Sequence, residues 1–246
     1  MHWVLQSTRF KHWIQSNNSD VLLVIGNLED GMARIPAMSF LCSMLVGSLR
    51  HQRNVYVLHS FCGTRNSRSH PESGLRGMIR SLTSQLLSMH EFDTGSMNVG
   101  RWKAGIRSNS SSTLGRLFGR LIEQLPDVVV FCVIDGISLF EMEPWNVELQ
   151  PIVETLLEAV ASREASARVK LLFACTTMSI YLSCRLAERN RLSIPTDAGN
   201  SRLLTSRTAH FELTKNNQLL YEEETNCSGT SRYRPSLVDV YEHGFE

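Results

Sequence analysis

The sequence predicts an α/β protein, a three-layer α/β/α sandwich around a five-stranded, mostly parallel sheet. Five apolar, β-rich segments carry this prediction, at residues 20–26, 55–62, 127–135, 169–176 and 208–214. Most of them are continuous apolar runs, which are typical of strands buried on both faces. Helical periodicity fills the gaps between them, and strands that alternate with helices favour right-handed crossovers onto both faces of the sheet.

Four apolar stripes with the spacing i, i+3, i+4, i+7 predict the helices, at residues 38–49, 75–89, 114–125 and 152–160. Ser112 or Thr113 is expected to cap the third helix, and Pro126 to end it. Pro151 is expected in the first turn of the fourth helix. Segments 91–112 and 191–207 are rich in polar residues and are expected to be long loops.

The same pattern divides the chain into three parts. Residues 1–18 are expected to form an N-terminal entry helix before the first strand. Residues 19–215 hold the alternating strands and helices and form the core domain. Residues 216–246 show little apolar periodicity and are expected to be a peripheral or mobile tail.

The composition narrows the possible functions. The 246 residues carry a net charge of +1, which gives no global field to attract nucleic acid or an anionic membrane. No run of about 18 apolar residues predicts membrane insertion, and the N-terminus lacks the pattern of a secretory signal. The six cysteines show no CxxC pairing and are expected to be core residues of a reduced, cytoplasmic protein.

A glycine frame directly follows the first predicted strand. Gly26 and Gly31 are separated by four residues, which is the spacing of a phosphate-binding Walker A loop. A working loop continues with a Lys that reaches the phosphates and a hydroxyl that holds Mg²⁺. Here Met32 and Ala33 stand at those two positions. The alternative is an ordinary strand-to-helix turn.

The residues inside this frame oppose phosphate as well. Glu29 and Asp30 place two negative charges where a triphosphate would lie. A missing charge-assisted contact from Lys costs roughly 1.5–3 kcal/mol, and a carboxylate about 5 Å from a phosphate costs on the order of 3 kcal/mol. Together these losses turn a micromolar site into a millimolar or weaker one.

Two later strands end in polar residues. The apolar run 128–134 ends at Asp135, which is the form of a Walker B strand whose Asp contacts Mg²⁺. The alternative is an Asp that caps the turn at Gly136. The run 170–175 ends in the hydroxyls of Thr176 and Thr177, which is the form of a sensor strand.

In their order, these pieces resemble the NACHT domains of STAND-type P-loop NTPases, and most closely the nephrocystin-like N-terminal region common in fungal proteins. The likeness spans roughly residues 1–215 and rests on five stretches: FKHWI and DVLLVIG at residues 10–26, VLHSFCG at 57–63, LRGMIRSLTSQLL at 75–87 and FCVIDGI at 131–137. The resemblance implies a sheet of P-loop NTPase type, in which the sensor strand separates the Walker A and Walker B strands. It also implies a nucleotide-dependent regulatory switch.

The chain departs from this family at the residues that carry its chemistry. Family members have two further acids after the Walker B Asp-Gly pair, and here Ser138 and Leu139 stand there. The next acids are Glu141 and Glu143, and Met178 stands where the family often has an Arg. The chain is also too short for the family's repeats, so it is expected to be a fragment or a degenerate stand-alone copy.

We therefore predict a non-catalytic scaffold or regulatory module that works through protein partners, without nucleic acid and without a required cofactor. The alternative is a switch that binds ATP or GTP weakly, with Mg²⁺ at Asp135. Its residual nucleotide site would comprise Gly26, Gly31, Met32, Ala33, Asp135 and Thr176. A third hypothesis, unrelated enzymatic chemistry in the cleft at the strand ends, lacks a recognisable nucleophile and base.

Overall fold

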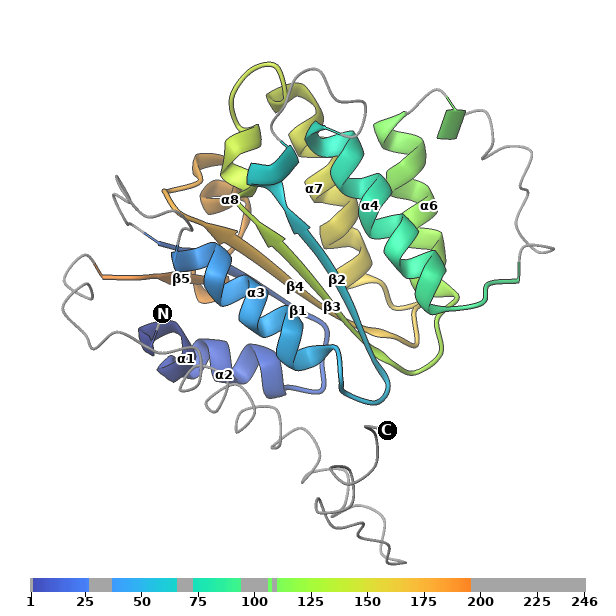
Figure 1. Cartoon of the computed structure of the whole chain (residues 1–246), viewed down its shortest axis with the longest axis horizontal. Helices are drawn as coiled ribbons and strands as arrows, with labels where there is room; N and C mark the ends of the chain where they lie inside the picture. The colour runs from blue at the N-terminus through green and yellow to red at the C-terminus, as the bar shows by residue number, and fades with distance from the viewer. Residues whose placement is uncertain (1, 27–36, 66–72, 94–105, 108–109, 196–246) are drawn as a thin grey trace, which may run out of the picture.

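The computed structural model describes residues 2–26, 37–65, 73–93, 106–107 and 110–195. In this part of the chain a five-stranded sheet has the order β2-β3-β4-β1-β5, and every neighbouring pair is parallel. Helices cover both faces (Figure 1), so the predicted three-layer α/β/α sandwich is confirmed. The strands are β1 (Asp20–Ile25), β2 (Val55–Phe61), β3 (Val129–Asp135), β4 (Arg168–Cys175) and β5 (Arg191–Ser193).

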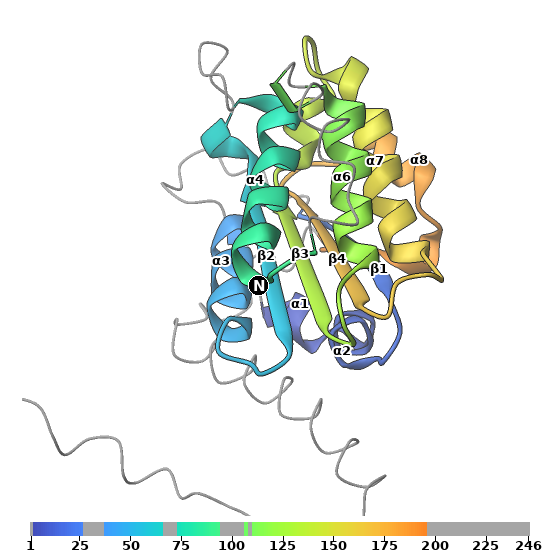
Figure 2. The same ribbon diagram turned by 90° about the vertical axis from the view of Figure 1, so that its right-hand side faces the viewer.

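Two helical layers enclose the sheet, as the turned view in Figure 2 shows. One layer holds α1 (His2–Gln6), α2 (Thr8–Gln15) and α3 (Ala37–Leu49). The other holds α4 (Gly74–Met89), α6 (Ser111–Glu123), α7 (Asn146–Ala161) and the short α8 (Ile180–Arg185). Three single helical turns lie in the connections: η1 (Cys62–Arg65) follows β2, η2 (Ile137–Phe140) follows β3, and η3 (Glu188–Asn190) precedes β5.

Alternation along each strand divides the core in two. In β1, Leu23 and Ile25 belong to the core cluster on the side of α4, α6 and α7, whereas Leu22 and Val24 belong to the cluster on the side of α2 and α3. Both sets are buried, so the strand is apolar at successive residues. On the α2 side the largest anchor is Trp13, whose ring meets Phe131 edge-on at 5.6 Å between centroids. Such a pair adds to the energy of burial.

The fifth strand corrects one prediction. Residues Arg191–Ser193 form β5 and pair with β1, although segment 191–207 was expected to be a loop. Only Leu192 of these three residues is buried, so the segment is too short to show a periodic pattern. The predicted strand at 208–214 lies outside the described residues, as do the end of the predicted core and the tail at 216–246.

Three helix boundaries also differ from expectation. The segment 1–18 holds two short helices that meet at Ser7. Ser110 caps α6, accepting a hydrogen bond from the Thr113 N–H at 3.4 Å, so the cap lies earlier than predicted. Pro151 lies inside α7 because that helix already begins at Asn146. The proline leaves the carbonyl of Val147 without its usual helical donor, and Val147 is 80% exposed.

The cysteines in the described part of the chain are free, and four of the five are buried core residues, as predicted: Cys42, Cys62, Cys132 and Cys175. Burial raises the pKa of Cys132 to about 12, which makes it an inert core thiol. Cys184 is exposed. No helix in the described ranges has both the length and the apolar character needed to cross a membrane.

Candidate functional site

The carboxyl ends of the parallel strands bring three predicted site residues to one edge of the sheet. Gly26 follows β1, Asp135 ends β3 and Thr176 follows β4. Strand β4 lies between β1 and β3, so the strand order implied by the family resemblance is confirmed. In open α/β sheets this edge is the usual place for a ligand. Gly31, Met32 and Ala33 lie outside the described residues.

Gly26 lies where the backbones of β1 and β4 come together. Its N–H donates to the carbonyl oxygen of Cys175 at 2.7 Å. A Cβ atom at this position would lie 2.9 Å from the backbone oxygen of Thr176 and 3.3 Å from Cγ of Met38. Any side chain would therefore push these two neighbours away, and the glycine allows the start of α3 to approach the sheet.

The first turn of α3 supplies a site residue that the sequence reasoning missed. Ser39 donates its hydroxyl hydrogen to Oδ2 of Asp135, with 2.5 Å between the oxygens. In a P-loop NTPase the hydroxyl at the helix start and the Walker B Asp share the Mg²⁺ ion. The residue before this hydroxyl is the phosphate-binding Lys. Here that residue is Met38, which is 1% exposed.

The Walker A spacing does not point to Ser39. Counted from Gly26, that spacing puts the hydroxyl at residue 33. The structure places a helix-start hydroxyl six residues later in the chain, beside the predicted Walker B Asp. The usable signal was the sequence Met38-Ser39-Phe40-Leu41 at the start of the apolar stripe, since a Walker A hydroxyl lies at the start of a helix.

Asp135 is deeply buried at the strand end. It is 5% exposed, and burial raises the pKa of its carboxyl above the ordinary value, while the hydrogen bond from Ser39 partly opposes this rise. Its Oδ1 atom is buried and has no hydrogen-bond partner within the part of the chain that the structure describes. Carboxylate and hydroxyl oxygens suit Mg²⁺, which proteins often bind through one or two such groups. Ser39 and Asp135 thus fit a Mg²⁺ ion in the nature of their donor atoms.

The next acid along the chain has another partner. The Glu141 carboxylate accepts hydrogen bonds from the hydroxyl of Ser179 and from the N–H of Ile180 at 3.0 Å. It therefore stabilises the start of α8, where the N–H groups lack helical partners. Ser138 forms hydrogen bonds to Cys175. At the two positions where the family carries acids, the chain offers a serine hydroxyl and the apolar Leu139.

Exposed apolar side chains gather beside this site. Five of the eight large apolar residues exposed in the described ranges lie in two segments, from η2 to the start of α7 and from the end of β4 to the start of α8. We call them the carboxyl-edge patch: Leu139, Met142, Val147, Met178 and Ile180. The Glu141–Ser179 bond joins the two segments that carry them. Val147 is 80% exposed and Met142 is 74% exposed. Exposed apolar patches are typical of contact sites.

A family model matches the chain from its N-terminus to the residue after β4. The family model described as Nephrocystin 3, N-terminal, matches residues 1–176. The match runs from the first helix through β4 and the residue after it, and so includes Ser39 and Asp135. No curated protein matches the chain in sequence.

Proposed function

The chain belongs to the nephrocystin 3 N-terminal family, and from that premise we propose that it is a non-catalytic, NACHT-type P-loop-NTPase-like domain that acts as a scaffold or regulatory interaction module. The observation that carries the proposal is the first turn of α3. The hydroxyl of Ser39 meets Asp135, but the residue before it is the buried, apolar Met38. The two groups that would hold Mg²⁺, Ser39 and Asp135, are thus present. The Lys that would bind the phosphates is replaced by Met38.

The chemistry of hydrolysis supports the non-catalytic part. Hydrolysis needs a group that orients the attacking water and charges that stabilise the transferred phosphoryl group. Glu141, the first acid after Asp135, is bound to the start of α8. Met38 carries no charge. These two positions would each have to change before the edge could hydrolyse a nucleotide at a useful rate.

The carboxyl-edge patch supports the interaction part. Apolar side chains that water surrounds in the free domain gain free energy when a partner covers them. The patch begins close to the site along the chain, because Leu139 follows Asp135 by four residues and is 43% exposed. A partner bound there would lie next to the turn that leaves β3. We place this protein in the cytoplasm, as the sequence leads us to expect.

Hydrolysis of ATP and GTP tests the proposal. We expect the wild-type rate with Mg²⁺ to equal that of an Asp135→Ala variant and of the buffer alone. A Mg²⁺-dependent rate that Asp135→Ala abolishes would refute the non-catalytic assignment. An Arg120→Gln variant is the control for substitution as such. Arg120 lies on α6, in the helical layer that does not contain Ser39, and its side chain is 63% exposed.

A photocrosslinking residue placed at position 142 tests the interaction part. We expect the full chain to form a discrete adduct in cell extract, and the adduct to weaken when Ile180→Asp charges the neighbouring segment. The same probe at Glu158, an exposed residue on the outer face of α7, is the matched control. Equal adducts from both positions, or an adduct that Ile180→Asp leaves unchanged, would contradict a contact at the patch.

The second candidate function is a weak nucleotide-binding switch, and the Ser39–Asp135 pair specifically favours it. Bound Mg²⁺ would be held by the Ser39 hydroxyl and the Asp135 carboxylate, and it would neutralise phosphate charge. The buried Oδ1 of Asp135 would gain a partner. Gly26, with Gly31, Met32, Ala33 and Thr176, would border the nucleotide. This candidate predicts binding without turnover, which a nucleotide titration separates from the first candidate.

A further inference from the structure

We propose that Lys170 and Arg168 form a binding site for a small phosphate-class oxyanion at the amino-terminal edge of the sheet, opposite the carboxyl edge that holds Asp135. Both residues lie on β4 and line a cavity of about 130 Å³ between the start of the sheet, the end of α2 and the turn before β2. The proposal is independent of the function proposed for the carboxyl edge.

Lys170 is buried, and its ammonium has more N–H donors than the one hydrogen bond described for it uses. It is 1% exposed, and its ammonium donates to the hydroxyl of Ser16 at 2.7 Å. An ammonium group has three N–H donors, and Lys170 forms no ion pair with any residue in the described part of the chain. A buried charge that no counter-charge pairs directly is costly, so an anion brought to this position gains a strong contact.

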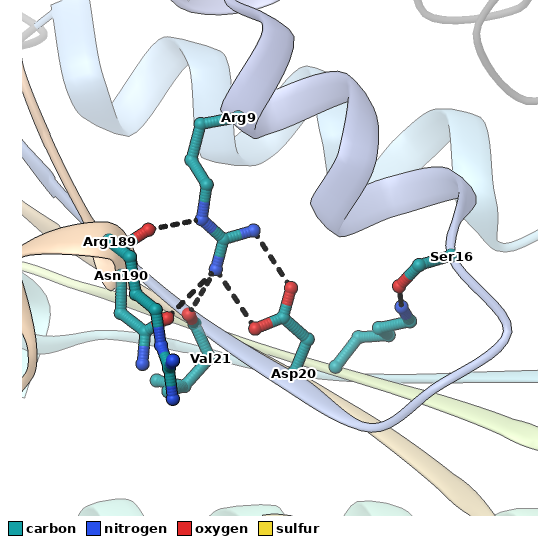
Figure 3. A network of polar contacts seen from close by, with 7 residues as sticks. Arg9, Ser16, Asp20, Val21, Arg189 and Asn190 are labelled. Carbon is teal, nitrogen blue, oxygen red and sulfur yellow. Dashed lines mark hydrogen bonds and ion pairs between the residues drawn. The ribbon is translucent and has the colours of Figure 1, made fainter.

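The carboxylate that could neutralise Lys170 is held by another cation. Asp20 lies opposite Lys170 in the β1–β4 register. Both of its oxygens accept hydrogen bonds from Arg9 (Figure 3), and the N···O distances are 2.8 and 2.9 Å. Arg9 also donates to the carbonyl oxygens of Val21 and Arg189, so its guanidinium is fixed toward Asp20. Arg9 therefore neutralises the charge of Asp20, and the positive charge of Lys170 is left without an ion-pair partner among the described residues.

Arg168 adds a second donor on the same face of β4, two residues before Lys170. Its terminal nitrogens contact Asp127 and Asn17, each at 3.3 Å. Its Nε is buried and has no acceptor among the described residues. The contacts at the terminal nitrogens fix the guanidinium plane. An oxyanion between Arg168 and Lys170 would accept from Nε and from the ammonium.

The cavity wall has the charge and size for this ligand. Three cations line it, Arg53, Arg168 and Lys170, against one carboxylate, that of Asp127. Since a water molecule needs roughly 10–15 Å³ of such space, the cavity can hold a tetrahedral oxyanion with a few waters. A nucleic acid or a folded partner could not enter it. The ligand is therefore a free phosphate-like ion or the terminal phosphate of a small molecule.

The protonation of Lys170 supplies a further check. Burial lowers its pKa from 10.5 to about 8, an effect to which Arg168 and Arg9 add and which Asp20 opposes. Arg53 and Asp127 are the other charged groups on the cavity wall. A bound anion favours the ammonium form, so binding above pH 8 must take up a proton. Sulfate, which stays doubly charged over this range, should bind more weakly at pH 9.5 than at pH 7.

Calorimetric titration of the full chain with inorganic phosphate at constant ionic strength tests the proposal. We expect saturable binding at one site in the wild type. Lys170→Met should weaken it by about tenfold or more, the loss expected for one charge-assisted hydrogen bond. Arg168→Gln should weaken it as well, which keeps the test valid if Lys170→Met rearranges the cavity. Methyl phosphate separates the two sources: binding like that of phosphate indicates a terminal phosphate group, and its exclusion indicates the free ion.

Two controls locate the binding. Lys11→Met removes the same charge from the other lysine of the described residues, which lies on α2 and contacts Gln6. Ser39→Ala removes the hydroxyl at the opposite edge of the sheet. Both should leave phosphate affinity unchanged. Absence of saturation below about 10 mM phosphate, unchanged affinity in folded Lys170→Met, or loss of binding in Ser39→Ala would each overturn the proposal.

Discussion

The two edges of the central sheet bury opposite charges in the same way. At the carboxyl edge, Asp135 accepts from the hydroxyl of Ser39 at 2.5 Å. At the amino edge, Lys170 donates to the hydroxyl of Ser16 at 2.7 Å. Asp135 is 5% exposed and Lys170 is 1% exposed. Each ionisable group thus forms a hydrogen bond with a neutral serine and no ion pair among the described residues, and burial shifts each pKa toward the uncharged form.

The serine that binds each buried charge lies at the end of a helix. Ser39 lies in the first turn of α3, where the helix dipole favours a negative charge. Ser16 caps the carboxyl end of α2, where the dipole favours a positive charge. The edges therefore differ in the ligand they would attract: the carboxyl edge suits a cation, and the amino edge suits an anion. In a working P-loop the cation for phosphate lies at the carboxyl edge, and this chain has a buried Met38 there.

The largest expected effect concerns the ion pair that isolates Lys170. Arg9 and Asp20 are each 19% exposed in their side chains, and Arg9 also binds two backbone carbonyls. Arg9→Met should lower the free energy of unfolding by about 2–4 kcal/mol, because Asp20 loses its partner in a poorly hydrated place. Urea unfolding at pH 7 measures this loss.

A matched variant sharpens that prediction. Arg120→Met breaks an exposed i,i+3 pair with Glu123 and should change the free energy of unfolding by less than about 0.5 kcal/mol. Adding Asp20→Asn to Arg9→Met should recover part of the lost stability, since the uncompensated carboxylate is gone. If Arg9→Met costs no more than Arg120→Met, the pair does not isolate Lys170.

The next effect comes from Lys170 itself. Its folded pKa of about 8 lies below its unfolded value of 10.5, so its contribution to stability is complete above the unfolded pKa and is lost as the pH falls through about 8. At pH 7 the buried ammonium costs about 3 kcal/mol. Lys170→Met should therefore stabilise the protein by about 2 kcal/mol at pH 7 and by little at pH 10. Unfolding curves at both pH values, with Lys11→Met as control, would show no difference between the variants if Lys170 were well hydrated.

A smaller effect is expected at Gly26, where the carboxyl edge is closed by backbone contact. Gly26→Ala places Cβ 2.9 Å from the Thr176 backbone oxygen and should lower the free energy of unfolding by about 1–2 kcal/mol. Gly119→Ala on α6 meets nothing within 4 Å and should raise it by about 0.5–1 kcal/mol, through helix propensity. Thermal unfolding of both variants checks the opposite signs, and two equal shifts would contradict the close approach at Gly26.

The smallest effect is expected at Asp135. Because its folded pKa is raised, the stability linked to this carboxyl is present below the unfolded pKa and is lost as the pH rises through the folded pKa. Asp135→Asn keeps an acceptor for Ser39 without the charge. It should stabilise the protein at pH 7 by up to about 1 kcal/mol and have no such effect near pH 3. A destabilised Asp135→Asn at pH 7 would mean that the carboxylate has a counter-charge at this edge.

The sequence predicted the parts of this molecule that depend on long apolar patterns. Four strands and four helices have clear periodicity, and the place of Asp135 at the end of β3 follows from one of them. The three-residue β5 has only Leu192 to bury and leaves no such pattern. Ser39 was missed because the glycine spacing was held fixed.

Lys170 shows a further reason why sequence alone falls short. It stood at the start of a predicted strand, where a lysine is normally solvated. Its ammonium donates to Ser16 at the end of α2, and Phe131 lies opposite it in the β3–β4 register. These contacts join residues far apart in the chain, and no local pattern of charge or hydropathy records them.

We propose that the carboxyl edge keeps the form of a nucleotide site without its function. The most direct test is a thermal-shift titration with ATP, ADP and GTP, with and without Mg²⁺, on the wild type and on Lys170→Met, which removes any phosphate contact at the amino edge. A ligand at 100 times its Kd stabilises the native state by about 2.7 kcal/mol. We predict no Mg²⁺-dependent rise in Tm at millimolar nucleotide. A Mg²⁺-dependent rise that persists in Lys170→Met and disappears in Asp135→Ala would contradict the claim and establish a nucleotide-binding switch.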